Sequence, residues 1–252
     1  MSSTLIAGPS TQVADTKSPD VIPPVAVIDT PLSKSISLLR PGLILGLLAL
    51  RFNSLVTDPV PALQLALPAV ALIQTVYAII CLPVAGSQSA KVVRKPRPGE
   101  KKKVDTNGPN TISTAILALL LSAISTPAVY VLFVLFGAPF LDHVQHTLLC
   151  SAHLSLLALF PIFYSRGVKG ETLIAVAGAS APLDETFGGL VGAGVGAWLG
   201  AVPIPLDWDR EWQKWPVTIV VGMFAGSLLC SAVSGTLLFG KRLSTTERST
   251  SN

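Results

Sequence analysis

Charged residues are scarce in this sequence. Only 13% of its 252 residues are Asp, Glu, Lys or Arg, whereas soluble domains carry roughly a quarter. Half of the residues are hydrophobic, and the mean hydropathy is +0.61. The scarcity of charge indicates that most of the chain does not face water. The net charge of +4 does not predict a nucleic-acid partner, because the Lys and Arg residues cluster in the connections between apolar runs.

Cysteine and the short motifs of common enzymes are also rare or absent. The three cysteines, Cys81, Cys150 and Cys230, are odd in number and lie inside apolar stretches, so we expect small buried side chains rather than disulfides. The sequence has no GxSxG, P-loop, HExxH or CxxC motif. The glycine-rich stretch 188–200 contains GxGxxxG, but no predicted strand precedes it. The sequence therefore predicts no catalytic residue, no cofactor and no metal.

Long apolar runs, by contrast, are abundant. A helix of about 20 apolar residues crosses the roughly 30 Å hydrocarbon core of a bilayer. Six runs match that length, at about 37–57, 60–84, 112–136, 144–164, 186–204 and 217–239. A further apolar stretch, 171–183, is short, and we interpret it as interfacial or re-entrant. The pattern predicts an all-α polytopic membrane protein with about six transmembrane helices within residues 37–240.

The distribution of basic residues predicts how these helices are oriented. With the N-terminus in the cytosol, fifteen of the 18 Lys and Arg residues fall on the cytosolic side, Arg40 and Arg166 among them. Cytosolic connections are enriched in Lys and Arg in this way. We therefore expect both termini in the cytosol, with four segments outside the helices: a disordered tail 1–36, a basic cytosolic loop 88–110, a lumenal connection 204–216 and a short tail 241–252. The loop 88–110 either attracts anionic membrane lipids or only fixes the topology.

Small residues recur every four positions in the run 186–204, at Gly188, Gly192, Gly196 and Gly200. At this spacing they share one helix face. Small residues let two membrane helices approach closely, so that van der Waals packing drives their association. The row packs on the run 217–239, which has small residues at Gly222 and Gly226, on a helix of another membrane protein, or on both along different parts of its length.

A polar stripe is expected on one face of the run 144–164, where His143, His146, Cys150 and His153 lie at helical spacing. His and Cys are the usual ligands of zinc, but the stripe extends over about 15 Å, so one ion reaches only part of it. The stripe either bonds to neighbouring helices, lies at the membrane interface, or contributes His143, His146 and Cys150 to a metal site completed elsewhere. We expect the first.

The connection 204–216, IPLDWDREWQKWP, concentrates charge and tryptophan between two apolar runs. Tryptophan is typical of the membrane–water boundary, and the connection has three: Trp208, Trp212 and Trp215. Asp207 and Asp209 are candidate metal ligands or acid–base groups, and Arg210 is expected to pair with Asp207 or Glu211. Tryptophan and arginine also anchor many protein contacts. We interpret the connection as an interfacial elbow, with partner contact and catalysis as alternatives.

The stretch GAWLGAVPIPLDWDREWQKWP, residues 196–216, resembles the signature of the PIG-F family of glycosylphosphatidylinositol (GPI) anchor biosynthesis proteins. The matching positions are Pro203, Pro205, Leu206, Asp207, Trp208, Asp209, Arg210, Trp212, Gln213, Trp215 and Pro216. The stretch APLDETFGGL at 181–190 and the segment with His146, Thr147, Leu148 and Ser155 also fit. The resemblance covers about 112–240.

The resemblance implies a multi-pass membrane subunit of the endoplasmic reticulum. Members of the family associate with and stabilise catalytic subunits that transfer ethanolamine phosphate from phosphatidylethanolamine to mannoses of the GPI precursor. The expected chain is then not an enzyme, and its partner-contact candidates are Gly188, Gly192, Gly196, Gly200, His146, Asp207, Trp208, Asp209, Arg210, Trp212 and Trp215. The alternative is a lipid-handling enzyme or phospholipid carrier that uses Asp207, Asp209 and the His146/His153 stripe.

Overall fold

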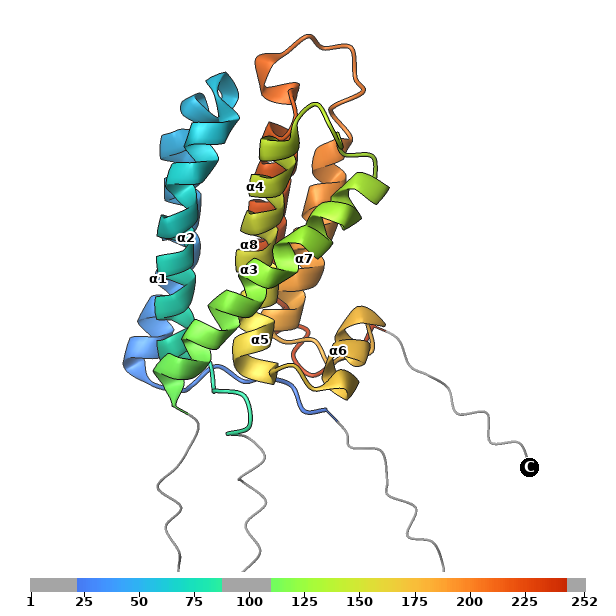
Figure 1. Ribbon diagram of the computed structural model, residues 1–252. Coiled ribbons are helices and arrows are strands. Elements are labelled where there is room, and N and C mark those ends of the chain that lie inside the picture. Colours follow the sequence, from blue (N-terminus) through green and yellow to red (C-terminus); the bar gives the residue numbers. More distant parts are fainter. Residues whose placement is uncertain (1–21, 88–109, 244–252) are drawn as a thin grey trace, which may run out of the picture.

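A computed structural model describes residues 22–87 and 110–243 (Figure 1). Every regular element in these ranges is a helix, which confirms the all-α prediction. In chain order the helices are α1 (Pro31–Thr57), α2 (Pro59–Cys81), α3 (Thr111–Leu135), α4 (Val144–Leu154), the π-helix η2 (Ser155–Leu159), α5 (Phe160–Arg166), α6 (Gly170–Ala177), α7 (Glu185–Ala201), the 3₁₀ turn η3 (Glu211–Gln213) and α8 (Val217–Thr236). Most of the predicted tails and the basic loop fall on residues 1–21, 88–109 and 244–252, outside the described residues.

Within residues 22–87 and 110–243, five helices are long and apolar enough to cross a membrane: α1, α2, α3, the continuous helix Val144–Arg166 and α8. The fifth predicted span, 186–204, corresponds to α7, whose 17 residues rise about 26 Å. It runs beside α8 along the bundle (Figure 1). The polytopic membrane fold is thus confirmed. The stretch 171–183 does not form a long helix, since α6 ends at Ala177 after two turns.

The ends of the two described ranges lie at one end of the bundle. In Figure 1 the coloured segments begin or end at residues 22, 87, 110 and 243 near the end where α6 lies, and the connection 204–216 lies at the opposite end. This arrangement agrees with an even number of crossings. The assignment of the α6 end to the cytosol stays a prediction.

Helix α1 begins earlier than predicted. Pro31 occupies its first turn, where a missing N–H costs nothing, and the Thr30 side chain accepts a hydrogen bond from the backbone N–H of Ser33 (3.1 Å). Residues 22–30 are extended rather than helical, and Val25 among them is buried. The boundary of the predicted tail at residue 36 was therefore wrong, because a proline and a capping threonine start the helix before the apolar run does.

The helix formed by α4, η2 and α5 lies at the centre of the bundle. Within its most apolar window 67% of the residues are buried, against 11–28% for the corresponding windows of α1, α2 and α3. The three outer helices instead expose leucines such as Leu38, Leu72 and Leu120. An apolar surface of this kind fits hydrocarbon rather than water.

Candidate functional site

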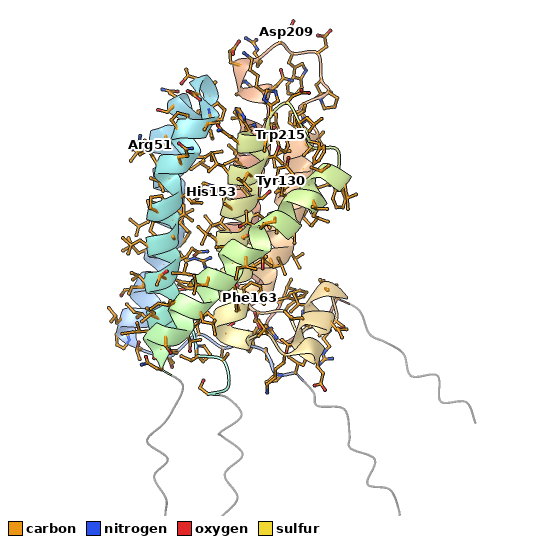
Figure 2. All side chains as sticks on the ribbon, viewed as in Figure 1. Arg51, Tyr130, His153, Phe163, Asp209 and Trp215 are labelled. Atoms are coloured by element: carbon orange, nitrogen blue, oxygen red, sulfur yellow. The ribbon has the colours of Figure 1, made fainter. Side chains whose placement is uncertain are left out.

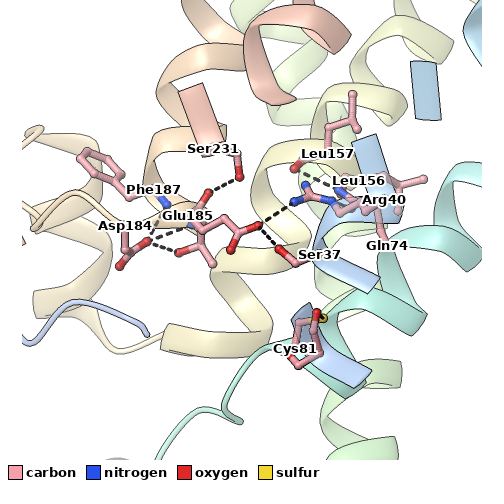
Figure 3. A network of polar contacts seen from close by, with 12 residues as sticks. Ser37, Arg40, Gln74, Cys81, Leu156, Leu157, Asp184, Glu185, Phe187 and Ser231 are labelled. Carbon is pink, nitrogen blue, oxygen red and sulfur yellow. Dashed lines mark hydrogen bonds and ion pairs between the residues drawn. The ribbon is translucent and has the colours of Figure 1, made fainter. Parts of the chain in front are cut away.

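A cluster of polar side chains joins α1, α2 and α7 inside the bundle (Figure 3). Arg40 of α1 is only 4% exposed. Its Nε–H donates to Oε1 of Gln74 (2.8 Å), and its Nη1 lies 3.6 Å from Oε1 of Glu185. Its guanidinium carbon also lies 4.1 Å from the ring centroid of Tyr77. A carboxylate, an amide and an aromatic face therefore surround the charge, which is the condition under which arginine is buried.

The position of Arg40 corrects the topology argument. The topology prediction places Arg40 among the bases of a cytosolic connection, but Arg40 lies in the interior of α1. The same prediction includes Arg166, which is buried at the end of α5. The signal that could have found Arg40 was its place inside the predicted span 37–57, since a charge within an apolar helix needs a partner.

Gln74 of α2 donates hydrogen bonds to two backbone carbonyls that the central helix leaves without a donor. Pro161 has no N–H that could donate to the carbonyl of Leu157. The N–H of Phe160 donates to the carbonyl of Ser155 in the π-helical pattern, so the carbonyl of Leu156 also lacks a backbone donor. The Gln74 Nε2 donates to both carbonyls, at 3.2 Å each. The same amide therefore accepts from Arg40 and satisfies the π-helix, which attaches α1 and α2 to the centre of the bundle.

Asp184 connects three segments at the end of the bundle where α7 begins. Its Oδ1 caps α7 by accepting from the backbone N–H groups of Thr186 and Phe187, at 3.0 Å each. Its Oδ2 forms an ion pair with Arg166 and accepts from the backbone N–H of Val25 (2.8 Å). Asp184 and Arg166 are both buried. One carboxylate thus holds α5, α7 and the extended N-terminal segment in place.

The four glycines of the row in α7 pack on α8. A Cβ atom added at any of them would lie within 3.0 Å of α8, at Ser234 for Gly188, Gly226 for Gly192, Gly222 for Gly196 and Thr218 for Gly200. All four are buried. The expectation of an internal pair with 217–239 is confirmed. The alternative that this row receives a helix of another protein is wrong, because α8 already occupies it.

The elbow 204–216 protrudes at the opposite end of the bundle (Figure 2). Gln213 holds it from inside through three hydrogen bonds. The Gln213 Nε2 donates to the carbonyls of Pro203 (2.8 Å) and Leu206 (2.9 Å), and its Oε1 accepts from the backbone N–H of Arg210 (2.9 Å). Gln213 is buried, although the residues before it in the elbow are mostly exposed. A single buried amide therefore sets the shape of an exposed loop.

The side chains that the elbow exposes include two carboxylates and a tryptophan. Asp207, Asp209 and Arg210 are exposed, and Trp208 is 53% exposed. Trp208 lies against Trp212, with ring centroids 5.9 Å apart. The expected pairing of Arg210 with Asp207 or Glu211 is wrong, because within the described residues Arg210 forms an ion pair with neither, and Glu211 pairs with Lys214.

Trp212 and Trp215 differ from Trp208 because they face the body of the protein. Both pack against its main hydrophobic core, and the ring of Trp215 meets Phe133 edge-on at 6.4 Å. The elbow therefore has an anchoring side and a free side. Of the predicted elbow contacts, Asp207, Trp208, Asp209 and Arg210 lie on the free side.

We expect Gln213→Leu to loosen the elbow without unfolding the bundle. The substitution removes three hydrogen bonds, at about 1 kcal/mol each. In detergent, trypsin should then cut after Arg210 or Lys214 faster than in the unaltered protein. Gln145→Leu, at an exposed glutamine, is the matched control. Equal cutting of both variants would contradict the role given to Gln213.

The histidine stripe does not form one site. His153 is fully buried, its Nδ1 lies 2.9 Å from the carbonyl oxygen of Leu149, and its ring lies 5.8 Å from Phe224. His143 is exposed and stacks edge-on with His146 at 5.0 Å. Within residues 22–87 and 110–243, no three His, Cys, Asp or Glu side chains come together as a metal site. The hypothesis of a metal site on this stripe therefore has no support.

The residues proposed for the alternative hypothesis, a lipid-handling enzyme or phospholipid carrier, also lie far apart. Figure 2 places Asp209 at the tip of the elbow and His153 inside the bundle, well below it. His153 is buried, whereas Asp207 and Asp209 are exposed. The carboxylates and the buried histidine do not converge on one substrate-sized site.

Known proteins match most of the chain. A model described as "GPI biosynthesis protein family Pig-F" matches residues 39–235. The chain is 57% identical over 219 residues to glycosylphosphatidylinositol anchor biosynthesis protein 11 of Neurospora crassa, covering 87% of this chain and 80% of that protein. It is 55% identical to the protein of the same name from Pyricularia oryzae (79% and 75% covered) and 37% identical to that from Aspergillus fumigatus (88% and 86% covered). No solved structure matches the chain.

Proposed function

The chain belongs to the GPI biosynthesis protein family Pig-F, and from this membership we propose that it is a non-catalytic subunit that binds and stabilises ethanolamine phosphate transferases. A role in GPI-anchor biosynthesis follows from the family and from the relatives. Beyond this role in the pathway, the proposal names a partner protein and the membrane in which the chain acts. The partner is a catalytic subunit that moves ethanolamine phosphate to mannoses of the GPI precursor, and the place is the membrane of the endoplasmic reticulum, with the elbow in the lumen.

The observation that supports this proposal best is the construction of the elbow. Gln213 holds the loop from inside, so that its exposed side chains keep their positions before any partner arrives. The free side combines an exposed indole with charges of both signs: Trp208, Asp207, Asp209 and Arg210. Tryptophan and arginine are the residues that most often dominate contact energies, and a preformed loop loses less entropy on binding.

The proposed contact differs from the one expected from the glycine row. The row is occupied by α8, so a transferase helix has no access to it. His146 is half-buried beside His143, so it contributes at most a contact at the edge of the proposed interface. The proposal therefore places the partner on the elbow.

Trp208→Ala is expected to reduce recovery of the transferase subunit severalfold when the tagged chain is purified from detergent-solubilised membranes. A truncated anchor residue of a protein contact typically costs about 2 kcal/mol or more. The matched control is Trp198→Ala on the outer face of α7, where the tryptophan is 65% exposed. Equal losses from both variants, or from neither, would contradict a contact centred on the elbow.

A second experiment distinguishes the proposed non-catalytic subunit from the alternative, an enzyme that acts on lipid. The chain purified without its partners is incubated with labelled phosphatidylethanolamine and a mannose-containing acceptor lipid. We expect no transfer, because the elbow carboxylates and the histidines do not form one site. Transfer by the chain alone, lost on Asp207→Asn with Asp209→Asn, would overturn the proposal in favour of an enzyme.

A further inference from the structure

A groove of about 570 Å³ opens between α2, α3 and α4. It exists because the three helices turn small side chains toward each other at one level. Ala71 of α2, Ala123 of α3 and Ala152 of α4 all line it. Leucines such as Leu119 and Leu148 also line it. Alanine leaves empty the space that larger side chains would fill.

The two hydroxyl groups in the wall of the groove already donate within the protein, so neither is free to donate to a ligand. Ser122 donates to the carbonyl of Ala118 (2.8 Å), and Thr126 donates to the carbonyl of Ser122 (3.1 Å), both within α3. Apart from these hydroxyl residues, only aliphatic residues and prolines line the groove. A polar or charged ligand would therefore lose its hydrogen bonds to water without replacement, which costs several kcal/mol.

The groove lies at the depth of the bilayer centre. Pro68 and Ala71 are midway along α2, and Ala123 is the central residue of α3. The groove begins one turn inside α4 and ends in η2. Headgroups and water stay near the helix ends, roughly 15 Å from this level. The occupant must therefore be apolar along the length that the groove contacts.

The size of the groove distinguishes the two apolar occupants that a membrane provides. An apolar cavity of about 150 Å³ holds one benzene, so this groove has room for on the order of twenty carbon atoms. A helix is about 10–12 Å across with its side chains, so it would lie over the groove and enter it only with single side chains. One hydrocarbon chain is thin enough to enter the space between the alanines along its length.

We propose that this groove is a binding site for one acyl chain of a membrane glycerophospholipid. The chain fills the space between the alanines, and its headgroup lies beyond the helix ends. In this way the lipid completes the packing of α2 against α3 and α4 at Leu67, Pro68 and Ala71, before Gln74. The proposal is independent of the transferase contact.

The test uses the chain alone in nanodiscs of phosphatidylcholine that carries a diazirine at mid-acyl chain. After irradiation, peptide mass spectrometry maps the lipid adducts. We expect them to concentrate on residues 119–127 and 148–156. Ala123→Phe, which fills the groove, should lower these adducts severalfold, whereas Ala128→Phe, at an exposed alanine of the same helix outside the groove, should leave them unchanged.

Three outcomes would overturn the site. One is an adduct density in the groove no higher than on the exposed leucines of α1, Leu38 and Leu50. Another is adducts that Ala123→Phe does not reduce. The third is loss of the groove adducts when the transferase subunit is added, which would assign the groove to a protein helix. Ala152→Phe fills the groove from α4 and replaces Ala123→Phe if that variant does not fold.

Discussion

Replacing Gly196 with alanine is expected to force α7 and α8 apart. The new methyl group would lie within 3.0 Å of the carbonyl oxygen of Gly222, which is backbone and has no rotamer to change. A Cβ at Gly222 would in turn meet the carbonyl oxygen of Gly196, so the two backbones are in direct contact. Overpacking of this kind costs about 1–3 kcal/mol, and a leucine at the same position costs more.

The measurement is thermal unfolding of the purified chain in detergent. For Gly196→Ala we expect a midpoint lower by roughly 5–10 °C, taking about 2–4 °C per kcal/mol for a chain of this size. Gly194→Ala is the matched control, because it lies in the same helix and a Cβ there meets nothing within 4 Å. It should be neutral or stabilising, since alanine favours a helix by up to about 1 kcal/mol over glycine. Equal effects of the two substitutions would show that the row does not determine the packing.

The expected loss of stability also changes how a lower recovery of the transferase subunit would be interpreted. A double substitution at Gly192 and Gly196 should still lower recovery of a transferase subunit, but through failure of the α7–α8 pair. The recovery should then fall together with the amount of folded chain. An elbow variant such as Trp208→Ala should lower recovery while the folded amount stays the same.

The positions of the membrane helices could be predicted because hydropathy and helix length are local properties. The second, third and sixth predicted spans begin within one residue of α2, α3 and α8. The boundary of α1 could not be found in the same way, since Thr30 and Pro31 start the helix before the apolar residues begin. Similarly, 171–183 is apolar enough for a helix, but α6 ends at Ala177 and the chain turns back through Gly178.

The buried polar cluster could not be predicted, because its partners are far apart in the chain. Arg40 and Glu185 are separated by more than a hundred residues, and nothing local connects them. The glycine row was predicted, but periodicity alone does not say whether a face meets a helix of the same chain or another protein. For Gln213, the motif that carried the resemblance identified the residue, and only the structure shows why an amide is needed there.

Asp184→Ala is expected to be among the most destabilising single substitutions in the described part of the chain. It leaves the buried guanidinium of Arg166 without its anion, and breaking a buried ion pair by removing one partner costs about 3–5 kcal/mol. It also removes the N-cap of α7, worth about 1 kcal/mol, and the acceptor for Val25. Glu171→Gln, at an exposed acid in the first turn of α6, is the control and should change the unfolding midpoint little.

The two roles of Asp184 can be separated with asparagine. Asp184→Asn keeps a carbonyl oxygen that can cap α7, so its loss of stability should come mainly from the unpaired charge of Arg166. Adding Arg166→Met removes that charge, and the double variant should therefore unfold at a higher temperature than Asp184→Asn alone, in spite of carrying two substitutions. If the double variant were instead less stable by the sum of the two single losses, the two groups would not be coupled. The end of the bundle would then depend on the cap of α7 and on backbone contacts rather than on the ion pair.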